Sequence, residues 1–287
     1  MTSFRFLRVS LFGILLPLGA APPVSEQTLT FASVEEHTLA LDLYRPTDDI
    51  VGVIIWVHGG AWRGGDRTGV DLKGMTQHGW AVASVDYRLS GDARFPAQIH
   101  DIKAAIRYLR AHADELNLPP TPFVIAGSSA GGHLAALVGV SNQSAVLEGN
   151  VGDDLETSSE VQAIVDLYGA SNLLTILPQS TPHGLNVRKP ALDLFIGGQP
   201  ENVPEMAKLA SPVYHVDARD PPLYLSHGDQ DPQMPINQAH EIHGAYERLG
   251  LPVHFEVMYG SAHGGPAFTA PEELTRIDTF LRKHLHR

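Results

Sequence analysis

The chain has 287 residues, of which 43% are hydrophobic, enough to bury a large core within one α/β domain. Its formal net charge of -12 and the absence of a basic patch exclude nucleic acid as a partner, because phosphate binding requires clustered positive charge. Cysteine is absent, so the chain can form no disulfide and can carry no lipid on a thioether.

Residues 1–21 have the pattern of a signal peptide. Arg5 and Arg8 precede an apolar run over residues 9–18, and small residues follow at 19–21. The run is too short to span a bilayer. We therefore predict export to the periplasm or the exterior, with cleavage near residue 20 or 21 and no membrane span in the mature chain, residues 22–287. An uncleaved N-terminal anchor is the alternative.

The first strands are predicted by their apolar patterns. Residues 27–44 alternate apolar and polar positions, as in an edge hairpin with one buried face. Residues 51–57 are almost continuously apolar, which is typical of a parallel strand covered on both faces. This strand runs into His-Gly-Gly-Ala-Trp at residues 58–62, where backbone N–H groups can turn into a site as an oxyanion hole. An ordinary glycine turn is the alternative.

Another buried strand is predicted over residues 80–88, followed by a helix that begins near Phe95. Three- and four-residue spacing places the apolar side chains of this helix against the sheet and its basic side chains in solvent. We expect Ile99, Ile102, Ile106 and Leu109 to be buried, and Lys103, Arg107 and Arg110 to be exposed.

The motif on which the chemistry depends is Gly-x-Ser-x-Gly at residues 127–131, centred on Ser129. An apolar strand precedes it and an apolar helix follows, which is the context of a nucleophile elbow rather than of a simple glycine-rich turn. Glycines on both sides allow a sharp reversal, so we expect a strained backbone at Ser129 with its hydroxyl clear of the sheet.

A further strand over residues 161–169 precedes a segment with six prolines, residues 173–216. We expect this proline density to prevent long helices, and we interpret the segment as a small loop-rich cap over a site. A surface excursion with no role in binding is the alternative.

Two more strands end in polar groups. Residues 222–226 lead to His-Gly-Asp-Gln-Asp at 227–231, and residues 253–258 lead to His263. The order serine, acid, histidine differs from the orders of the chymotrypsin and subtilisin folds. The helices after these strands are expected to bury apolar stripes. The first comprises Ala239, Ile242, Tyr246 and Leu249, and the second, in a helix over residues 273–285, comprises Leu274, Ile277, Phe280 and Leu281.

These segments resemble the α/β-hydrolases of the esterase and lipase group, and most closely the secreted carbohydrate esterases that include feruloyl and acetylxylan esterases. The resemblance rests on residues 58–62, 84–89, 95–101, 127–133, 227–231 and 263–265. It implies the α/β-hydrolase fold, a mostly parallel central sheet flanked by helices, with a small loop-rich cap insertion. Ala61 departs from the His-Gly-Gly-Gly pattern but keeps its N–H, and Met234 replaces the valine of Asp-x-x-Val-Pro.

A serine hydroxyl becomes a good nucleophile only beside a neutral imidazole, which in turn needs a carboxylate to fix its tautomer. We assign these roles to Ser129, His263 and Asp231. The family pattern places the acid four residues after the histidine of His-Gly, which favours Asp231 over Asp229; we expect Asp229 to bond within its own loop. The N–H groups of Gly60, Ala61 and Ala130 are the predicted oxyanion donors.

The other histidines are less suitable. His58 is expected to brace the oxyanion loop, whereas His133 and His227 do not fit the order of the three groups. The close helical pair His240 and His243 lacks an obvious third ligand and indicates a solvated helix face, so we predict no metal and no cofactor.

The leading hypothesis is a secreted serine carboxylic ester hydrolase that acts through an acyl-enzyme on short acyl or feruloyl esters of carbohydrates. An amidase or peptidase of the oligopeptidase type, or a non-catalytic binding module on the same fold, is the alternative. The expected partner is a small-molecule or carbohydrate ester.

Overall fold

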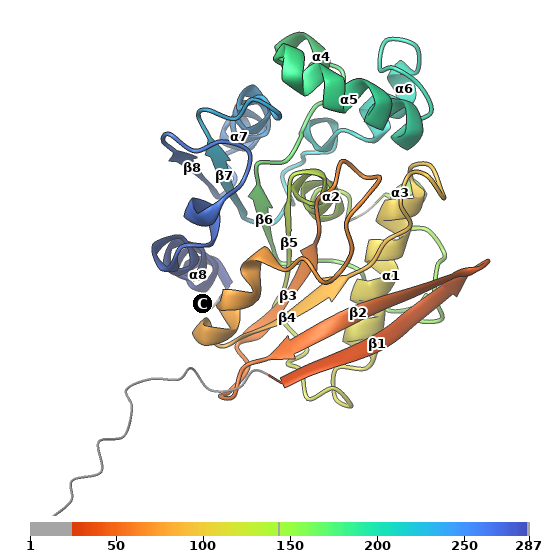
Figure 1. Cartoon of the computed structure of the whole chain (residues 1–287). Coiled ribbons are helices and arrows are strands. Elements are labelled where there is room, and N and C mark those ends of the chain that lie inside the picture. Colours follow the sequence, from red (N-terminus) through yellow and green to blue (C-terminus); the bar gives the residue numbers. More distant parts are fainter. Residues whose placement is uncertain (1–24, 143, 286–287) are drawn as a thin grey trace, which may run out of the picture.

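The computed structural model describes residues 25–285 except residue 143, and the expected signal peptide lies outside these residues. Within them, one twisted sheet has the strand order β1-β2-β4-β3-β5-β6-β7-β8 (Figure 1). The hairpin β1–β2 is antiparallel and joins β4 in antiparallel fashion, while all other neighbours are parallel. The predicted edge hairpin and the mostly parallel α/β architecture are therefore confirmed.

The elements have the following bounds. The strands are β1 (Ser25–Val34), β2 (His37–Arg45), β3 (Gly52–Val57), β4 (Trp80–Val85), β5 (Phe123–Ser128), β6 (Ala163–Leu167), β7 (Leu223–Gly228) and β8 (Val253–Met258). The α-helices are α1 (Ala97–Ala111), α2 (Ala130–Gly139), α3 (Ala145–Glu148), α4 (Ile176–Gln179), α5 (Pro182–Phe195), α6 (Pro204–Leu209), α7 (Asn237–Leu249) and α8 (Pro271–Leu285). The 3-10 helices are η1 (Asp71–His78), η2 (Pro212–Tyr214) and η3 (Pro266–Thr269).

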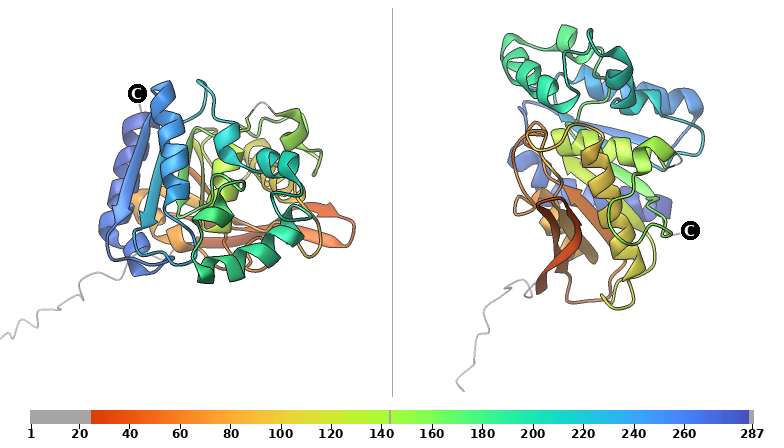
Figure 2. Two further views of the ribbon diagram at one scale, coloured as in Figure 1. Left: turned by 90° about the horizontal axis from the view of Figure 1, so that it is seen from above. Right: turned by 90° about the vertical axis from the view of Figure 1, so that its right-hand side faces the viewer.

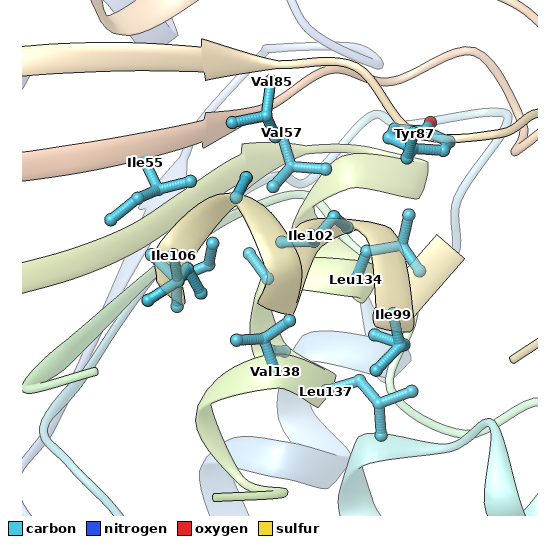
Figure 3. Close-up of a cluster of buried hydrophobic side chains, with 14 of the residues drawn as sticks. Ile55, Val57, Val85, Tyr87, Ile99, Ile102, Ile106, Leu134, Leu137 and Val138 are labelled. Carbon is cyan, nitrogen blue, oxygen red and sulfur yellow. The ribbon is translucent and has the colours of Figure 1, made fainter. Parts of the chain in front are cut away.

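The central strands are buried on both faces, as their continuous apolar sequences predict. In β3, Val53 and Ile55 pack on one side with α1, α2 and α7, whereas Ile54 and Trp56 pack on the other side with η1 and α8. Figure 3 shows the first of these two layers, where Ile102 of α1 and Leu134 of α2 meet the strands. Both helical layers leave the carboxyl ends of the parallel strands free to form a site.

Helix α1 buries its predicted apolar stripe, but the prediction that Lys103 and Arg107 face solvent is wrong. Both side chains are buried, and they pair with the two carboxylate oxygens of Glu148, which ends α3. The Lys103 Nζ–Oε2 distance is 3.0 Å and the Arg107 Nη1–Oε1 distance is 2.5 Å. The partner that permits this burial is far away in sequence, so helical spacing could not reveal it.

Helix α7 also departs from the prediction at one position. Ala239, Ile242 and Tyr246 are buried, but Leu249 is 48% exposed at the last residue of the helix. The helix ends at Gly250 in the left-handed region, so Leu249 lies at the end of the apolar stripe, in the last turn of the helix.

The segment expected to be a loop-rich cap is mainly helical. Helices α4, α5 and α6 lie beyond the carboxyl end of β6, at the top of Figure 1 and of the right-hand view of Figure 2, whereas the left-hand view of Figure 2 looks down on them. The expectation that proline prevents long helices here is wrong, because α5 has 14 residues. Prolines open α5, α6 and η2 at their first turns, where no backbone N–H needs a helical partner. Pro190, inside α5, lies on the exposed face.

Candidate active site

Ser129 lies at the sharp turn between β5 and α2, and its backbone angles are φ 56° and ψ −118°. This region strongly disfavours a non-glycine residue, so the strain expected at the elbow is present. Two flanking glycines permit it. A Cβ at Gly131 would lie 2.0 Å from the carbonyl oxygen of Val57, and one at Gly127 would lie 2.3 Å from the carbonyl oxygen of Gly131.

The three residues assigned to the triad come together. The distance from Ser129 Oγ to His263 Nε2 is 2.8 Å, and the distance from His263 Nδ1 to Asp231 Oδ2 is 2.6 Å. A carboxylate only accepts hydrogen bonds, so Nδ1–H donates to Asp231 and the free Nε2 accepts from the serine hydroxyl. The arrangement can remove a proton from Ser129 and stabilise the charge that then forms on the imidazole.

Asp231 is held as an ionised acceptor. Its side chain is fully buried, and its Oδ1 accepts the N–H groups of Gln233 and Met234, each over 2.8 Å. Burial by itself would raise the pKa of this carboxyl, but hydrogen bonds from His227 and His263 outweigh it and hold the pKa well below its ordinary value. Asp231 therefore stays negatively charged beside the imidazole.

Asp229, the rival acid, does not face His263. Its Oδ1 accepts the N–H of Gly260 over 2.7 Å, so it ties its loop to the loop after β8. The expectation that Asp229 bonds within its own loop was therefore wrong about the partner, since Gly260 follows a different strand.

The other histidines have distinct positions. His133 accepts the indole N–H of Trp62 at Nδ1 and donates from Nε2 to the carbonyl of Ala210. Burial lowers the pKa of His133 to about 4, so it is neutral. His227 is fully buried behind the acid, with Nε2 3.0 Å from the carbonyl oxygen of Met234 and 3.5 Å from Asp231 Oδ2. This proximity was not predicted from the sequence, although the i, i+4 spacing of His227 and Asp231 is visible there.

The oxyanion loop, residues 58–62, lies directly against the serine, since a Cβ at Gly59 would be 3.4 Å from Ser129 Cβ. Gly60 and Ala61 both have positive φ, 107° and 53°. Ala130 is the first residue of α2, where a helix leaves its N–H groups without intrahelical partners. The three N–H groups expected to bind an oxyanion are thus carried by two segments that adjoin Ser129.

Trp62 has a different role from the one its position suggested. Trp62 ends the motif from which the oxyanion loop is predicted, but its side chain is fully buried. Its ring stacks on Phe195 of α5, with centroids 4.6 Å apart and an interplanar angle of 9°. Trp62 therefore packs the oxyanion loop against the cap and does not line an open pocket.

Tyr168, which follows β6, supports the imidazole and was not identified from the sequence. It is almost fully buried, and its ring meets that of His263 edge-on with centroids 4.9 Å apart. Its φ of 47° turns the chain at this point. The sequence offered one indication of this role: Tyr168 directly follows a predicted parallel strand, and most residues of the site lie at the ends of such strands.

The cap is fastened to the loops of the site. Arg188 of α5 donates from Nη2 to the carbonyl of Gln233 over 2.9 Å, and Thr181 bonds to the carbonyl of Pro232. Both carbonyls belong to the loop that carries Asp231. Among the residues that the structure describes, no three His, Asp or Glu side chains are grouped to hold a metal ion, and no helix is long and apolar enough to cross a membrane.

Comparison with known proteins identifies the family to which the chain is similar. Residues 41–246 match the BD-FAE family. Esterase LipC of Mycobacterium tuberculosis is 31% identical over 234 residues, which are 78% of this chain and 56% of LipC. The probable carboxylic ester hydrolase LipM of the same organism is 31% identical over 207 residues, 69% of this chain and 46% of LipM. The chain thus spans about half the length of these curated relatives.

Two solved structures share the fold at similar identity. A truncated form of a carbohydrate esterase from gut microbiota is 30% identical with a TM-score of 0.77, covering 90% of this chain and 96% of that one. A bifunctional GH43-CE protein of Bacteroides eggerthii is 32% identical with a TM-score of 0.80, covering 91% of this chain and 35% of that one. The chain therefore belongs to the BD-FAE family of α/β-hydrolase esterases.

Proposed function

We propose that the chain is an exported serine carboxylesterase that removes short acyl or feruloyl groups from carbohydrates through an acyl-enzyme at Ser129. The observation that carries this proposal is the continuous hydrogen-bonded series from Ser129 through His263 to Asp231. A serine, an imidazole and a buried carboxylate in this geometry form the machinery of acyl transfer.

In the first step, His263 Nε2 takes the proton of Ser129 as Oγ attacks the ester carbonyl carbon. The carbonyl oxygen becomes an oxyanion, which the N–H groups of Gly60, Ala61 and Ala130 bind. Preorganised donors of this kind are worth about 3 to 4 kcal/mol each in the transition state. The positive φ at Gly60 and Ala61 is consistent with a loop shaped for this purpose.

In the second step, the imidazolium gives its proton to the departing alkoxide, and the C–O bond to the alcohol breaks. Asp231, kept ionised by the N–H groups of Gln233 and Met234 and by His263 itself, stabilises the positive charge on His263 in the meantime. Water then attacks the acyl-enzyme with His263 as base again, the acid product leaves, and Ser129 recovers its proton.

The substrate part of the proposal rests on the similarity to proteins described as carbohydrate esterases. Export rests on residues 1–21 alone. Both are independent of the catalytic step, so each requires its own test.

A substrate panel tests the proposal directly. Purified protein is offered acetylated xylan, methyl ferulate and short p-nitrophenyl esters, and released acid is measured. We expect turnover of at least one carbohydrate ester that depends on Ser129. Turnover of peptide or amide substrates in place of esters would contradict the assignment to ester hydrolysis, and turnover of only free aryl esters would contradict the carbohydrate part. Export is tested by cell fractionation, which compares the location of the full chain with that of a chain lacking residues 2–21.

A further inference from the structure

The carbonyl groups of the oxyanion loop are held by hydrogen-bond donors. The Tyr87 hydroxyl donates to the carbonyl oxygen of His58 over 3.1 Å and lies 3.4 Å from that of Gly59. Nδ1–H of His58 donates to the same Gly59 oxygen over 2.8 Å. The N–H of Arg63 donates to the carbonyl oxygen of Gly60 over 3.1 Å. Three successive carbonyl groups of the loop are therefore fixed.

Fixing a carbonyl also fixes an N–H group. A peptide unit is planar and trans, so its C=O bond and the N–H bond of the following residue point in opposite directions. The direction of the Gly59 carbonyl thus sets the direction of the Gly60 N–H, and the Gly60 carbonyl sets that of the Ala61 N–H. These are two of the three proposed oxyanion donors.

The loop needs such support because its conformation is intrinsically unfavourable. Ala61 and Trp62 have φ of 53° and 59°, a region that non-glycine residues occupy only at a cost in conformational energy. Without external contacts the chain would relax toward negative φ, and relaxation would rotate the peptide units that carry the two N–H groups.

Tyr87 is well suited to hold the loop. It follows β4, is 4% exposed, and stacks its ring on that of His58 with centroids 4.3 Å apart and an interplanar angle of 12°. Figure 3 shows it just past Val85, at the carboxyl end of the strand. Burial raises the pKa of its hydroxyl far above the ordinary value, so the group remains a hydrogen-bond donor at all working pH values.

We propose that Tyr87 is a positioning residue for the oxyanion hole: its hydroxyl holds the His58 carbonyl, keeps His58 in place to donate to the Gly59 carbonyl, and so supports the direction of the Gly60 N–H. This role rests on the proposed function. Tyr87 does not touch the substrate; it acts through the backbone of the loop.

The test is Tyr87→Phe, which removes the hydroxyl and keeps the ring that stacks on His58. Tyr246→Phe is the matched control, because the buried Tyr246 hydroxyl also donates to a backbone carbonyl, that of Pro221, over 3.2 Å. For both variants, kcat/KM on p-nitrophenyl acetate, the inhibition constant of an alkyl trifluoromethyl ketone and the thermal midpoint are measured. The ketone forms a tetrahedral oxyanion on the serine and so reports on the hole itself.

In Tyr87→Phe, kcat/KM is expected to fall about tenfold and the inhibition constant of the ketone to rise by about the same factor. Tyr246→Phe is expected to show a similar fall in thermal midpoint with both kinetic constants unchanged. The positioning role is overturned if Tyr87→Phe keeps both constants within about twofold, or if the control loses as much as the test variant. Ser129→Ala separates this from the proposed function: full activity in that variant overturns the serine mechanism itself.

Discussion

Nδ1–H of His263 donates to Oδ2 of Asp231 over 2.6 Å, and the two residues stand on the loops that follow the adjacent strands β7 and β8. The hydrogen bond selects the tautomer in which Nε2 is free to accept a proton from Ser129. The other carboxylate oxygen, Oδ1, supports this hydrogen bond. It accepts the backbone N–H groups of Gln233 and Met234, which fix the plane of the carboxylate.

This relationship predicts different effects for the two acids of the β7 loop. Asp231→Asn is expected to lower kcat by about 10³ to 10⁴, because an amide can donate to Nδ1 and stabilise the wrong tautomer. Asp229→Asn is expected to cost less than about tenfold, because Asp229 accepts the Gly260 N–H at 2.7 Å, a role that an amide oxygen can fill. Steady-state kinetics on p-nitrophenyl acetate check both. A larger loss in Asp229→Asn would move the catalytic acid to that residue.

The elbow predicts opposite stability effects at two neighbouring serines. Ser129→Ala should lower kcat by several orders of magnitude while keeping the strained backbone. Ser129→Gly should also be inactive but more stable than Ser129→Ala by about 1 kcal/mol, because glycine tolerates φ 56°. Ser128 lies in β5, so Ser128→Gly should be less stable than Ser128→Ala by about 0.5–1 kcal/mol. Urea denaturation measures both differences, and the same sign at both positions would contradict strain at Ser129.

The acyl site is expected to be small. Ala61 places a methyl group in the oxyanion loop, and Trp62 behind it is packed against Phe195 and cannot swing away easily. A buried methylene adds about 0.8 kcal/mol only while room remains, and overpacking then reverses the trend. Values of kcat/KM on p-nitrophenyl esters should therefore peak at two to about four acyl carbons. A steady rise toward long chains would indicate an open apolar cleft of the lipase type.

Asp166 predicts a pH dependence of stability. Burial raises its pKa to about 7, although His227 and the Gly169 N–H oppose the shift. Unfolded aspartate has a pKa of about 3.9, so between about pH 4 and pH 7 the native state holds a proton that the unfolded state has lost. The contribution of Asp166 to the free energy of unfolding therefore falls as pH rises through this window. Asp220, whose pKa burial also raises to about 7, contributes in the same direction.

Asp166→Asn removes this titration and keeps an oxygen that can accept the Gly169 N–H at 2.8 Å. We expect the free energy of unfolding of the variant, minus that of the parent protein, to be larger at about pH 8 than at about pH 5. Urea denaturation at the two pH values measures this difference. Asp220 is present in both proteins and cancels from the comparison. An equal difference at the two pH values would show that Asp166 titrates normally.

Glu148 predicts a large stability loss on neutralisation. Glu148→Gln removes the carboxylate with which the buried Lys103 and Arg107 both pair. Breaking a buried pair costs about 3–5 kcal/mol, and since Glu148 is 34% exposed we expect about 2 kcal/mol or more. Glu205→Gln is the control, because the Glu205–Lys208 pair is exposed and should change stability by less than about 0.5 kcal/mol. Equal effects in chemical denaturation would show that the buried cations are solvated.

The sequence predicted the architecture well because the relevant signals are local. Continuous apolar runs mark β3, β4 and β5. The motif also places glycine at positions 127 and 131, where the fold leaves no room for a side chain, since an added Cβ would lie 2.3 and 2.0 Å from a backbone oxygen. Since the carboxyl ends of parallel strands meet at one edge, the order of motifs along the chain was enough to bring Ser129, Asp231 and His263 together.

What the sequence could not predict depends on contacts between distant segments. Lys103 looks like a solvent residue until Glu148 is placed beside it, 45 positions later. Tyr87 and Tyr168 look like ordinary strand-end aromatics, and their contacts with the oxyanion loop and His263 follow from the strand order rather than from any motif. The prolines of the cap misled because their effect depends on position within a helix, and three of them open one.

The stacking of Trp62 on Phe195 gives the protein an internal optical probe. The chain has three tryptophans, and all are fully buried, Trp56 and Trp80 within the sheet. Only Trp62 spans the boundary between the oxyanion loop and α5. Separation of the cap from the sheet would expose that one indole to water and shift part of the emission to longer wavelength. Intrinsic fluorescence can therefore report whether the cap separates from the oxyanion loop during turnover, with no label attached.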